Sequence, residues 1–339
     1  MSELRFVLGA LLLAAAVTSC TNDPPAAPAP SAGGEGAEEG EGADDAGRPP
    51  PPVAHVGTAA RGGIPVLVFH QLCGVACAAT DTYGITKSEF ARMLGSIKRT
   101  GYQTLSMADF VRAHAGLTVG LPQRPILITF DDGRIDGYQN ADPVLRDLGF
   151  EATMFIITAS ATGNSKFAMQ WPQIREAAAS GRWTIQLHAH AGHVQVPIAM
   201  DPAGVTTTGA FYGFLQCAPR APGCRSLESF DDWKERSERD LAMGDALLAS
   251  ELGPALYTPQ SFAVPYGDYG QNHSNDARIA GELRRVLDAH FAVWFTQPSS
   301  DPNFMRPSVS DSHEVARFRI VDRTTAEDVD AWLARHAEP

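Results

Sequence analysis

The chain has 339 residues, of which 44% are hydrophobic, so it is long and apolar enough to bury a substantial core. Its net charge is −12, and no basic stripe runs along it, which excludes electrostatic binding to nucleic acid. The composition leaves the oligomeric state open.

The first 20 residues predict an export signal. An apolar run, FVLGALLLAAAV, follows the basic residue Arg5 and is too short for a transmembrane helix. Val17-Thr18-Ser19-Cys20 is similar to a bacterial lipobox, in which the signal is cleaved before a cysteine that carries lipid. We therefore expect an exported lipoprotein of the bacterial cell envelope, anchored to a membrane at Cys20. A signal cleaved elsewhere is the alternative.

Residues 21–60 consist mostly of Pro, Ala, Gly and acids. Seven acids and one arginine give this segment half of the net charge of the chain. Such a composition cannot bury enough apolar surface to offset the entropy lost on ordering. We expect a disordered linker over residues 21–60, between the anchor and one folded domain over residues 61–339.

Beyond the linker, short apolar runs alternate with amphipathic segments. Strands are predicted at 64–70, 125–130, 151–157, 183–188, 261–267 and 291–296. Helices are predicted at 86–101, 109–116, 141–149, 171–181, 226–253, 275–290 and 324–336. This alternation predicts an α/β fold with a mostly parallel sheet, and roughly seven such units favour a barrel over an open sheet.

The cysteines other than Cys20 stand in two close pairs, Cys73 with Cys77 and Cys217 with Cys224. An even number in an exported chain predicts two disulfides, although four cysteines permit three connectivities. The spacings do not suit a zinc ribbon, which disfavours a four-cysteine zinc site.

Two adjacent aspartates, Asp131 and Asp132, follow the apolar strand predicted at 125–130. Neighbouring carboxylates repel, so they need either a solvated turn or a bound positive group. Asp132-Gly133 is by itself a common hairpin signal, but here a helix is predicted to follow. Catalytic residues of α/β barrels gather where strands end, so we expect a functional site at this pair.

Three histidines, His188, His190 and His193, lie at the end of the strand predicted at 183–188, with only small residues between them. The five-residue separation of His188 and His193 is not a helical repeat, so a loop must bring their imidazoles together. We interpret these histidines as metal ligands, with an adventitious surface cluster as the alternative.

Together with the turn AVPYGDYG, these residues resemble the polysaccharide deacetylase family, defined by the NodB homology domain and known as carbohydrate esterase family 4. Thr129-Phe130-Asp131-Asp132-Gly133 matches the first motif of that family. His188 and His193 correspond to the histidines of its second motif, but they are five residues apart rather than four. Pro265-Tyr266-Gly267 matches the third motif, with Ala263 where an arginine is usual. The wider spacing and Ala263 are similar to the poly-β-1,6-N-acetylglucosamine deacetylase branch.

The resemblance runs from about residue 63 to 336 and implies a distorted (β/α)7 barrel. It also implies a metal-dependent hydrolase that removes N-acetyl groups from poly-β-1,6-N-acetylglucosamine, peptidoglycan or a chitin-like glycan. An O-acetyl esterase on the same scaffold and a non-catalytic glycan-binding lipoprotein are the alternatives.

The resemblance also assigns roles to residues. Asp132, His188 and His193 would hold a divalent metal, with Zn²⁺ expected and Co²⁺ or Ni²⁺ as alternatives. Asp131 would be the general base, and the backbone N–H of Tyr266 would help to stabilise the oxyanion.

Two parts of the family's catalytic set have no evident counterpart in the sequence. The late Leu-x-His motif that supplies a general acid is missing; His190 and His313 are candidates on composition alone, and we expect both to be bystanders. Arg306 is the candidate to replace the missing arginine. His70 resembles a family position near the barrel mouth, but a structural role fits it equally well, and it is not assigned to the site.

Overall fold

The computed structural model describes residues 63–78, 82–163, 165–219, 222–307 and 312–336. The expected signal peptide with Cys20 and the linker over residues 21–60 lie outside these ranges. Among the helices that the structure describes, none has the length and apolar character needed to cross a membrane.

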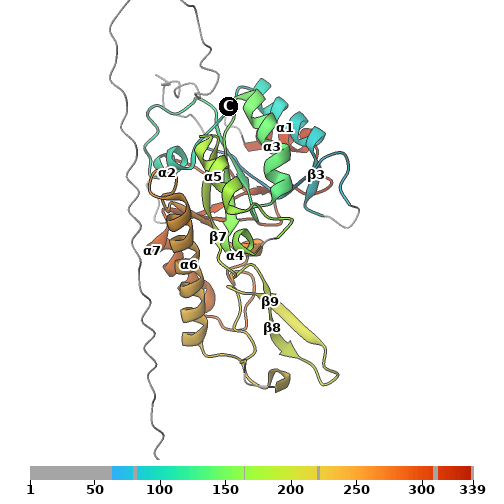
Figure 1. Cartoon of the computed structure of the whole chain (residues 1–339), viewed down its shortest axis with the longest axis vertical. Helices are drawn as coiled ribbons and strands as arrows, with labels where there is room; N and C mark the ends of the chain where they lie inside the picture. The colour runs from blue at the N-terminus through green and yellow to red at the C-terminus, as the bar shows by residue number, and fades with distance from the viewer. Residues whose placement is uncertain (1–62, 79–81, 164, 220–221, 308–311, 337–339) are drawn as a thin grey trace, which may run out of the picture. The chain divides into compact units, whose positions relative to one another are not determined.

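A curved sheet of parallel strands forms the centre of the folded part (Figure 1). Its order is β12 (Glu314–Ala316), β11 (Val293–Thr296), β10 (Ser261–Ala263), β7 (Trp183–Ala189), β6 (Ala152–Ile157), β5 (Pro125–Phe130), β1 (Val66–Phe69) and β13 (Phe318–Arg319). A short strand, β4 (Gln103–Thr104), adds to β5 outside this path. All of these pairs are parallel, so the mostly parallel sheet predicted from the sequence is confirmed.

The two ends of this strand order meet at Arg317, which makes the sheet a nearly closed barrel. β12 pairs with β11 and β13 pairs with β1, and Arg317 is the single residue between β12 and β13. The Arg317 N–H donates to Thr296 O at 3.0 Å, and the Ile320 N–H donates to Val68 O at 3.1 Å. One continuous segment therefore closes the seam by changing its partner strand at Arg317.

Side chains along β5 alternate between two apolar cores. Ile126, Ile128 and Phe130 belong to the core between the barrel and its helices, whereas Leu127 belongs to the core inside the barrel. The alternation continues past the end of the strand and places Asp131 on the interior side. The adjacent residue, Asp132, must then point elsewhere.

The helices are α1 (Lys87–Arg99), α2 (Met107–His114), α3 (Ile135–Leu148), α4 (Thr158–Thr162), α5 (Trp171–Ala179), α6 (Phe230–Leu252), α7 (Ile279–His290) and α8 (Ala326–His336). α2 closes one end of the barrel, because its Met107 and Phe110 pack into the interior core. α3 begins six residues before the helix predicted at 141–149, since the Gly and Asn residues in its first turns weaken the helical signal.

Other differences from the predicted elements are local. The strand predicted at 261–267 ends at Ala263, because Pro265–Gly267 forms a tight turn. A small parallel sheet of β2 (Gln71–Cys73) and β3 (Gly84–Thr86) was not predicted. The antiparallel hairpin of β8 (Gln195–Met200) and β9 (Thr206–Ala210), which projects from the barrel in Figure 1, was also not predicted. Most of its side chains are exposed on both faces, so it lacks the alternating apolar pattern of a half-buried strand.

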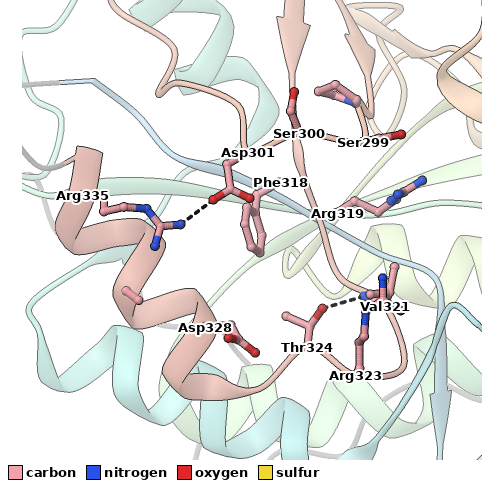
Figure 2. A pocket seen from close by; sticks show the side chains of 12 residues that line it. Ser299, Ser300, Asp301, Phe318, Arg319, Val321, Arg323, Thr324, Asp328 and Arg335 are labelled. Carbon is pink, nitrogen blue, oxygen red and sulfur yellow. Dashed lines mark hydrogen bonds and ion pairs between the residues drawn. The ribbon is translucent and has the colours of Figure 1, made fainter.

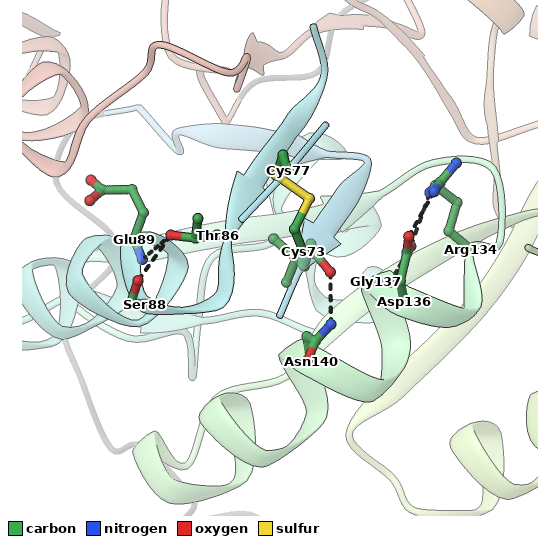
Figure 3. The surroundings of a disulfide bond; sticks show 10 residues. Cys73, Cys77, Thr86, Ser88, Glu89, Arg134, Asp136, Gly137 and Asn140 are labelled. Carbon is green, nitrogen blue, oxygen red and sulfur yellow. Dashed lines mark hydrogen bonds and ion pairs between the residues drawn. A yellow bond between two sulfur atoms is a disulfide. The ribbon is translucent and has the colours of Figure 1, made fainter. Parts of the chain in front are cut away.

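Both expected disulfides are present, each between near neighbours in the sequence. They join Cys73 to Cys77 and Cys217 to Cys224. Figure 3 shows the first bond next to α3, where the Asn140 side-chain amide donates to Leu72 O at 2.7 Å. This bond fixes the chain only a few residues after the end of β1.

A cavity of about 500 Å³ lies between β13, α8 and the loop after β11 (Figure 2). Its wall includes Phe318, Arg319 and Arg323, and at one side Arg335 pairs with Asp301. None of the site residues predicted from the sequence lines this cavity.

Candidate active site

Asp132, His188 and His193 come together where β5 and β7 end. The Asp132 Oδ1 atom lies 3.4 Å from His188 Nε2 and 3.3 Å from His193 Nε2. Zinc bonds of about 2.0–2.1 Å in a tetrahedral arrangement separate ligand atoms by about 3.3 Å. Asp132 Oδ1 therefore lies at ligand spacing from both imidazole nitrogens, and all three atoms lie within 4.8 Å of one another, so they could bind one divalent ion.

The environment of Asp132 supports a metal independently of the sequence motif. Its Oδ1 atom is buried and has no hydrogen-bond partner among the described residues. Leaving a charged oxygen buried without a partner destabilises a protein by several kcal/mol. A cation at the point faced by both imidazoles would satisfy this oxygen, so the residues fit a metal ion.

His188 is held in the orientation that a ligand needs. It is 1% exposed, and its Nδ1 donates to Ala263 O at 2.7 Å. With the proton on Nδ1, the lone pair of Nε2 points toward Asp132. Ala263, which stands where the family usually has an arginine, thus contributes its carbonyl to the site.

The protonation states of two of the three ligands also suit metal binding. For the third, burial would lower the pKa of His188, but the carboxylates of Asp131 and Asp132 outweigh burial and raise it, so a cation that binds there must displace a proton from this imidazole. Burial and the neighbouring His188 lower the pKa of His193 to about 4, so this imidazole is neutral at pH 7. Burial alone would raise the pKa of the Asp132 carboxyl, but the surrounding imidazoles hold it well below its usual range. A neutral imidazole and an ionised carboxylate are the forms that bind cations.

Two turns at the site contain left-handed residues other than glycine. Asp132 has φ 71° and is followed by Gly133 at φ 61°; Tyr266 has φ 60° and is followed by Gly267 at φ 65°. The positive φ of Gly133 disfavours any other residue there, and an added Cβ atom would lie 2.9 Å from Cδ1 of Ile156. Such strain persists where a site depends on the conformation. Here it turns Asp132 away from the barrel interior and toward the histidines.

Tyr266 stands at the rim beside the metal ligands. Its ring centroid lies 4.5 Å from that of His193, and the residue is 39% exposed. The turn predicted to carry the oxyanion donor is therefore adjacent to the histidine pair.

Asp131 faces the barrel interior and pairs with Arg317. Arg317 Nη1 donates to Asp131 Oδ1 and Nη2 donates to Oδ2, both at 2.7 Å, and both residues are fully buried. Burial would raise the pKa of Asp131, but the Arg317 guanidinium outweighs it and keeps the pKa below its usual value. The arginine that holds the expected base is thus Arg317, and the sequence-based suggestion of Arg306 is wrong.

His70 lies beside Asp131, although its sequence context did not assign it to the site. Its Nε2 lies 3.9 Å from Asp131 Oδ2, and its Nδ1 is buried without a hydrogen-bond partner among the described residues. The exposed ring of Tyr83 lies 5.0 Å from the His70 ring. The sequence could have indicated His70 only through its position directly after the buried strand β1. A structural histidine can occupy that position equally well.

The other two histidine candidates have partners elsewhere. His190 Nδ1 lies 2.9 Å from the Thr158 hydroxyl. His313 Nδ1 lies 2.8 Å from Phe291 O. Because His313 directly precedes β12, it stands at the amino end of a barrel strand. The metal ligands are at the carboxyl ends, so His313 is at the other end of the barrel from them. His190 follows β7 at its carboxyl end, but its ring contacts Thr158.

The parallel barrel thus brings one carboxylate and two imidazoles together at the carboxyl ends of its strands, in an arrangement that could hold a metal ion. Residues 118–282 match the model of the polysaccharide deacetylase family. This part of the chain, just under half of its length, is therefore similar to the polysaccharide deacetylases, in agreement with the resemblance found in its motifs.

Named relatives point the same way. YxkH of Bacillus subtilis, classed by name with the polysaccharide deacetylases, is 31% identical over 131 residues, which are 38% of this chain and 42% of YxkH. The poly-β-1,6-N-acetyl-D-glucosamine N-deacetylase of Staphylococcus epidermidis is 29% identical over 115 residues, which are 33% of this chain and 39% of that protein. The chain thus spans less than half the length of either relative.

Solved structures share the fold over most of the chain. A de-N-acetylase from Aggregatibacter actinomycetemcomitans has a TM-score of 0.62 and 20% identity, covering 80% of this chain and 99% of that one. IcaB from Ammonifex degensii has a TM-score of 0.56 and 25% identity, covering 80% and 97%. These likenesses confirm the expected barrel.

The ligand set predicts metal content. The wild-type protein, prepared without chelators, should carry about one divalent ion per chain by elemental analysis. His188→Ala should lose most of it, because one of three ligands is gone. His190→Ala is the matched control and should keep its metal, since that ring faces Thr158. Unchanged metal in His188→Ala would refute the ligand assignment.

The buried ion pair predicts a large effect on stability. Arg317→Met leaves the Asp131 carboxylate buried and unpaired, so it should lower the free energy of unfolding by about 3–5 kcal/mol in chemical denaturation. Combining it with Asp131→Leu removes both charges and should restore much of the loss. If the double variant is no more stable than Arg317→Met, the ion pair does not account for the effect.

Proposed function

We propose that this protein is a metal-dependent deacetylase that hydrolyses the N-acetyl groups of a polysaccharide containing N-acetylglucosamine. The observation that carries this proposal is a buried Asp132 oxygen that faces two imidazole nitrogens and has no hydrogen-bond partner among the described residues, with a second carboxylate, Asp131, beside it. The family match and the names of the relatives support the same chemistry.

Within that substrate class, we propose a β-1,6-linked polymer as the first substrate to test. One group of relatives is named for poly-β-1,6-N-acetyl-D-glucosamine, and the five-residue spacing of His188 and His193, together with Ala263, is similar to that branch. Peptidoglycan and chitin-like β-1,4 glycans remain the comparison substrates.

Asp132, His188 and His193 would hold the divalent ion, with Zn²⁺ as the first choice for two imidazoles and one carboxylate. When bound, such an ion polarises the amide carbonyl and makes water more acidic. Asp131 acts as general base, because its Oδ2 faces the space between His70 and His188 and can accept a proton from the attacking water. Arg317 keeps this carboxylate ionised and fixed in direction.

His70 is proposed to deliver the proton to the departing amine. Water adds to the amide carbonyl and gives one proton to Asp131; the C–N bond then breaks, and the nitrogen must gain a proton to leave. His70 Nε2 lies 3.9 Å from Asp131 Oδ2, and its Nδ1 has no hydrogen-bond partner in the described part of the chain, so this ring can relay the proton from Asp131 to the departing nitrogen. The backbone N–H of Tyr266 is proposed to stabilise the oxyanion formed in between.

The alternative functions are separable from this one. An O-acetyl esterase would use the same residues, and only the acetylated group would differ. A non-catalytic glycan binder would have no need for a buried carboxylate oxygen aimed at two imidazoles. We therefore place N-deacetylation first.

We also propose that the chain is an exported lipoprotein, with a signal over residues 1–20, a linker over 21–60 and the catalytic domain over 61–339. The support is the apolar run before Cys20 and the pairing of all four remaining cysteines in disulfides, which persist in oxidising compartments.

The two aspartates predict different defects. Asp131→Asn should retain metal and lose about 10²- to 10⁴-fold in turnover, because only the general base is removed. Asp132→Asn should lose both metal and turnover. Acetate and free amine would be followed with β-1,6 and β-1,4 N-acetylglucosamine oligomers, peptidoglycan fragments and O-acetylated sugars.

His70→Gln belongs to the same series and should keep its metal while losing about 10²-fold in turnover. His313→Gln is the control and should keep both. Equal loss of metal in the two aspartate variants would mean that both carboxylates bind the ion. A wild-type protein that binds metal yet releases no acetate from any N-acetylated substrate would overturn the deacetylase proposal.

The anchor predicts a processing defect. Cys20→Ala should abolish fatty-acid labelling and leave an unlipidated precursor, because the modified cysteine supplies the acyl chains that stable anchoring requires. The folded domain should keep its metal. Normal labelling of Cys20→Ala in cells would remove the lipoprotein proposal.

A further inference from the structure

A carboxylate on α6 holds the loop that joins the two histidine ligands. The backbone N–H of His190 donates to Asp240 Oδ2 at 2.9 Å, and that of Ala191 donates to Asp240 Oδ1 at 2.8 Å. Asp240 is only 7% exposed. Both oxygens of one buried side chain are thus directed at successive residues of the five-residue span from His188 to His193.

The wide spacing of the ligands explains why this loop needs an external partner. β7 ends at Ala189, so His188 is fixed by the barrel, whereas His193 lies beyond the last residue that β6 can pair with. The N–H groups of residues 190 and 191 have left the strand ladder and need other acceptors. Asp240 supplies an acceptor for each and so determines the path of the chain to His193.

A tyrosine also restrains this loop. Tyr212, which is 1% exposed, donates its hydroxyl to Asp240 Oδ2 at 2.5 Å. The ring of the same tyrosine packs against Gly192, where a Cβ atom would lie 2.9 Å from ring carbons. The residue directly before His193 is therefore confined by Tyr212, and Tyr212 is held by Asp240.

α6 also packs closely against β7. At Gly244, four residues after Asp240, an added Cβ atom would lie 2.5 Å from Leu187 and 3.2 Å from the backbone nitrogen of His190. The helix thus approaches the ligand segment as closely as glycine permits. This approach fixes the position of Asp240 relative to β7.

From this geometry we propose that Asp240 is a positioning residue for the metal centre. It sets the place of His193 Nε2 relative to Asp132 and His188, and thereby the affinity for the metal. The inference rests on the proposed metal-dependent function, but it concerns binding and can be tested without a substrate.

The test is a competition between the protein and a zinc chelator. In Asp240→Asn the side-chain NH₂ faces an N–H donor, so at least one bond to the loop is lost. We expect Zn²⁺ affinity to fall about 10- to 100-fold, the usual range when a partner that orients a metal ligand is removed. Asp132, His188 and His193 are all intact in this variant.

Asp245→Asn is the matched control, because it changes the same chemistry on the same helix. The Asp245 carboxylate accepts from the Tyr257 hydroxyl at 2.6 Å, and Tyr257 is not on the histidine loop. In Asp245→Asn the side-chain amide oxygen can still accept from Tyr257, and we expect the Zn²⁺ affinity of this variant to stay at the wild-type value. A purely structural role for Asp240 would lower the thermal stability of Asp240→Asn and leave its Zn²⁺ affinity unchanged.

Asp240→Glu keeps the charge and provides a second variant if Asp240→Asn does not fold. Its longer side chain displaces the loop, so we expect a several-fold loss of Zn²⁺ affinity. Wild-type affinity in either folded Asp240 variant, or an equal loss in Asp245→Asn, would overturn the proposal. A wild-type protein that binds no Zn²⁺ would refute both the proposed metal centre and the role of Asp240. A wild-type protein that binds Zn²⁺ but releases no acetate would overturn only the deacetylase assignment and leave the role of Asp240 intact.

Discussion

The buried pair of Asp131 and Arg317 connects the fold to the chemistry. Two charges removed from water lose hydration, and this loss is offset only by close, well-directed contacts. The guanidinium makes two parallel 2.7 Å bonds to the carboxylate and also lies 5.5 Å from the ring centroids of Phe155 and Phe295. Because Arg317 is also the residue at which the barrel closes, the group that holds the proposed base is part of the barrel wall itself.

The same pair explains why adjacent aspartates can coexist at the end of β5. Alternation along the strand sends Asp131 inward to Arg317, and the left-handed conformation of Asp132 sends the next carboxylate toward His188 and His193. Each negative charge thus has its own positive counterpart, one supplied by the chain and one by the proposed ion. Two neighbouring residues can therefore perform different tasks without sharing an environment.

Local sequence patterns were sufficient to predict the helices and strands that bury an apolar face. β5 matches its predicted range because PILITF is wholly buried, and the strand-end aspartates and histidines follow from such elements. The pattern could not reveal Arg317 or Asp240, because their partners are 186 and about 50 residues away in the sequence. Neither lies in a recognised motif; each acquires its role only when the barrel and α6 are assembled. The β8–β9 hairpin was missed for a related reason, since exposed strands carry no apolar alternation.

The disulfide next to His70 has a consequence for where the protein matures. The bond joins residues only four apart, just beyond the end of β1, and the same segment is otherwise tied to α3 through Asn140. Cytosolic thiol reductants keep such a bond open, whereas oxidising compartments allow it to form. A newly made chain in the cytosol therefore lacks one covalent restraint on the residues that follow His70. If the chain is exported as proposed, this restraint is added only after the chain leaves the cytosol, so the redox state of the compartment becomes part of how this side of the site is ordered.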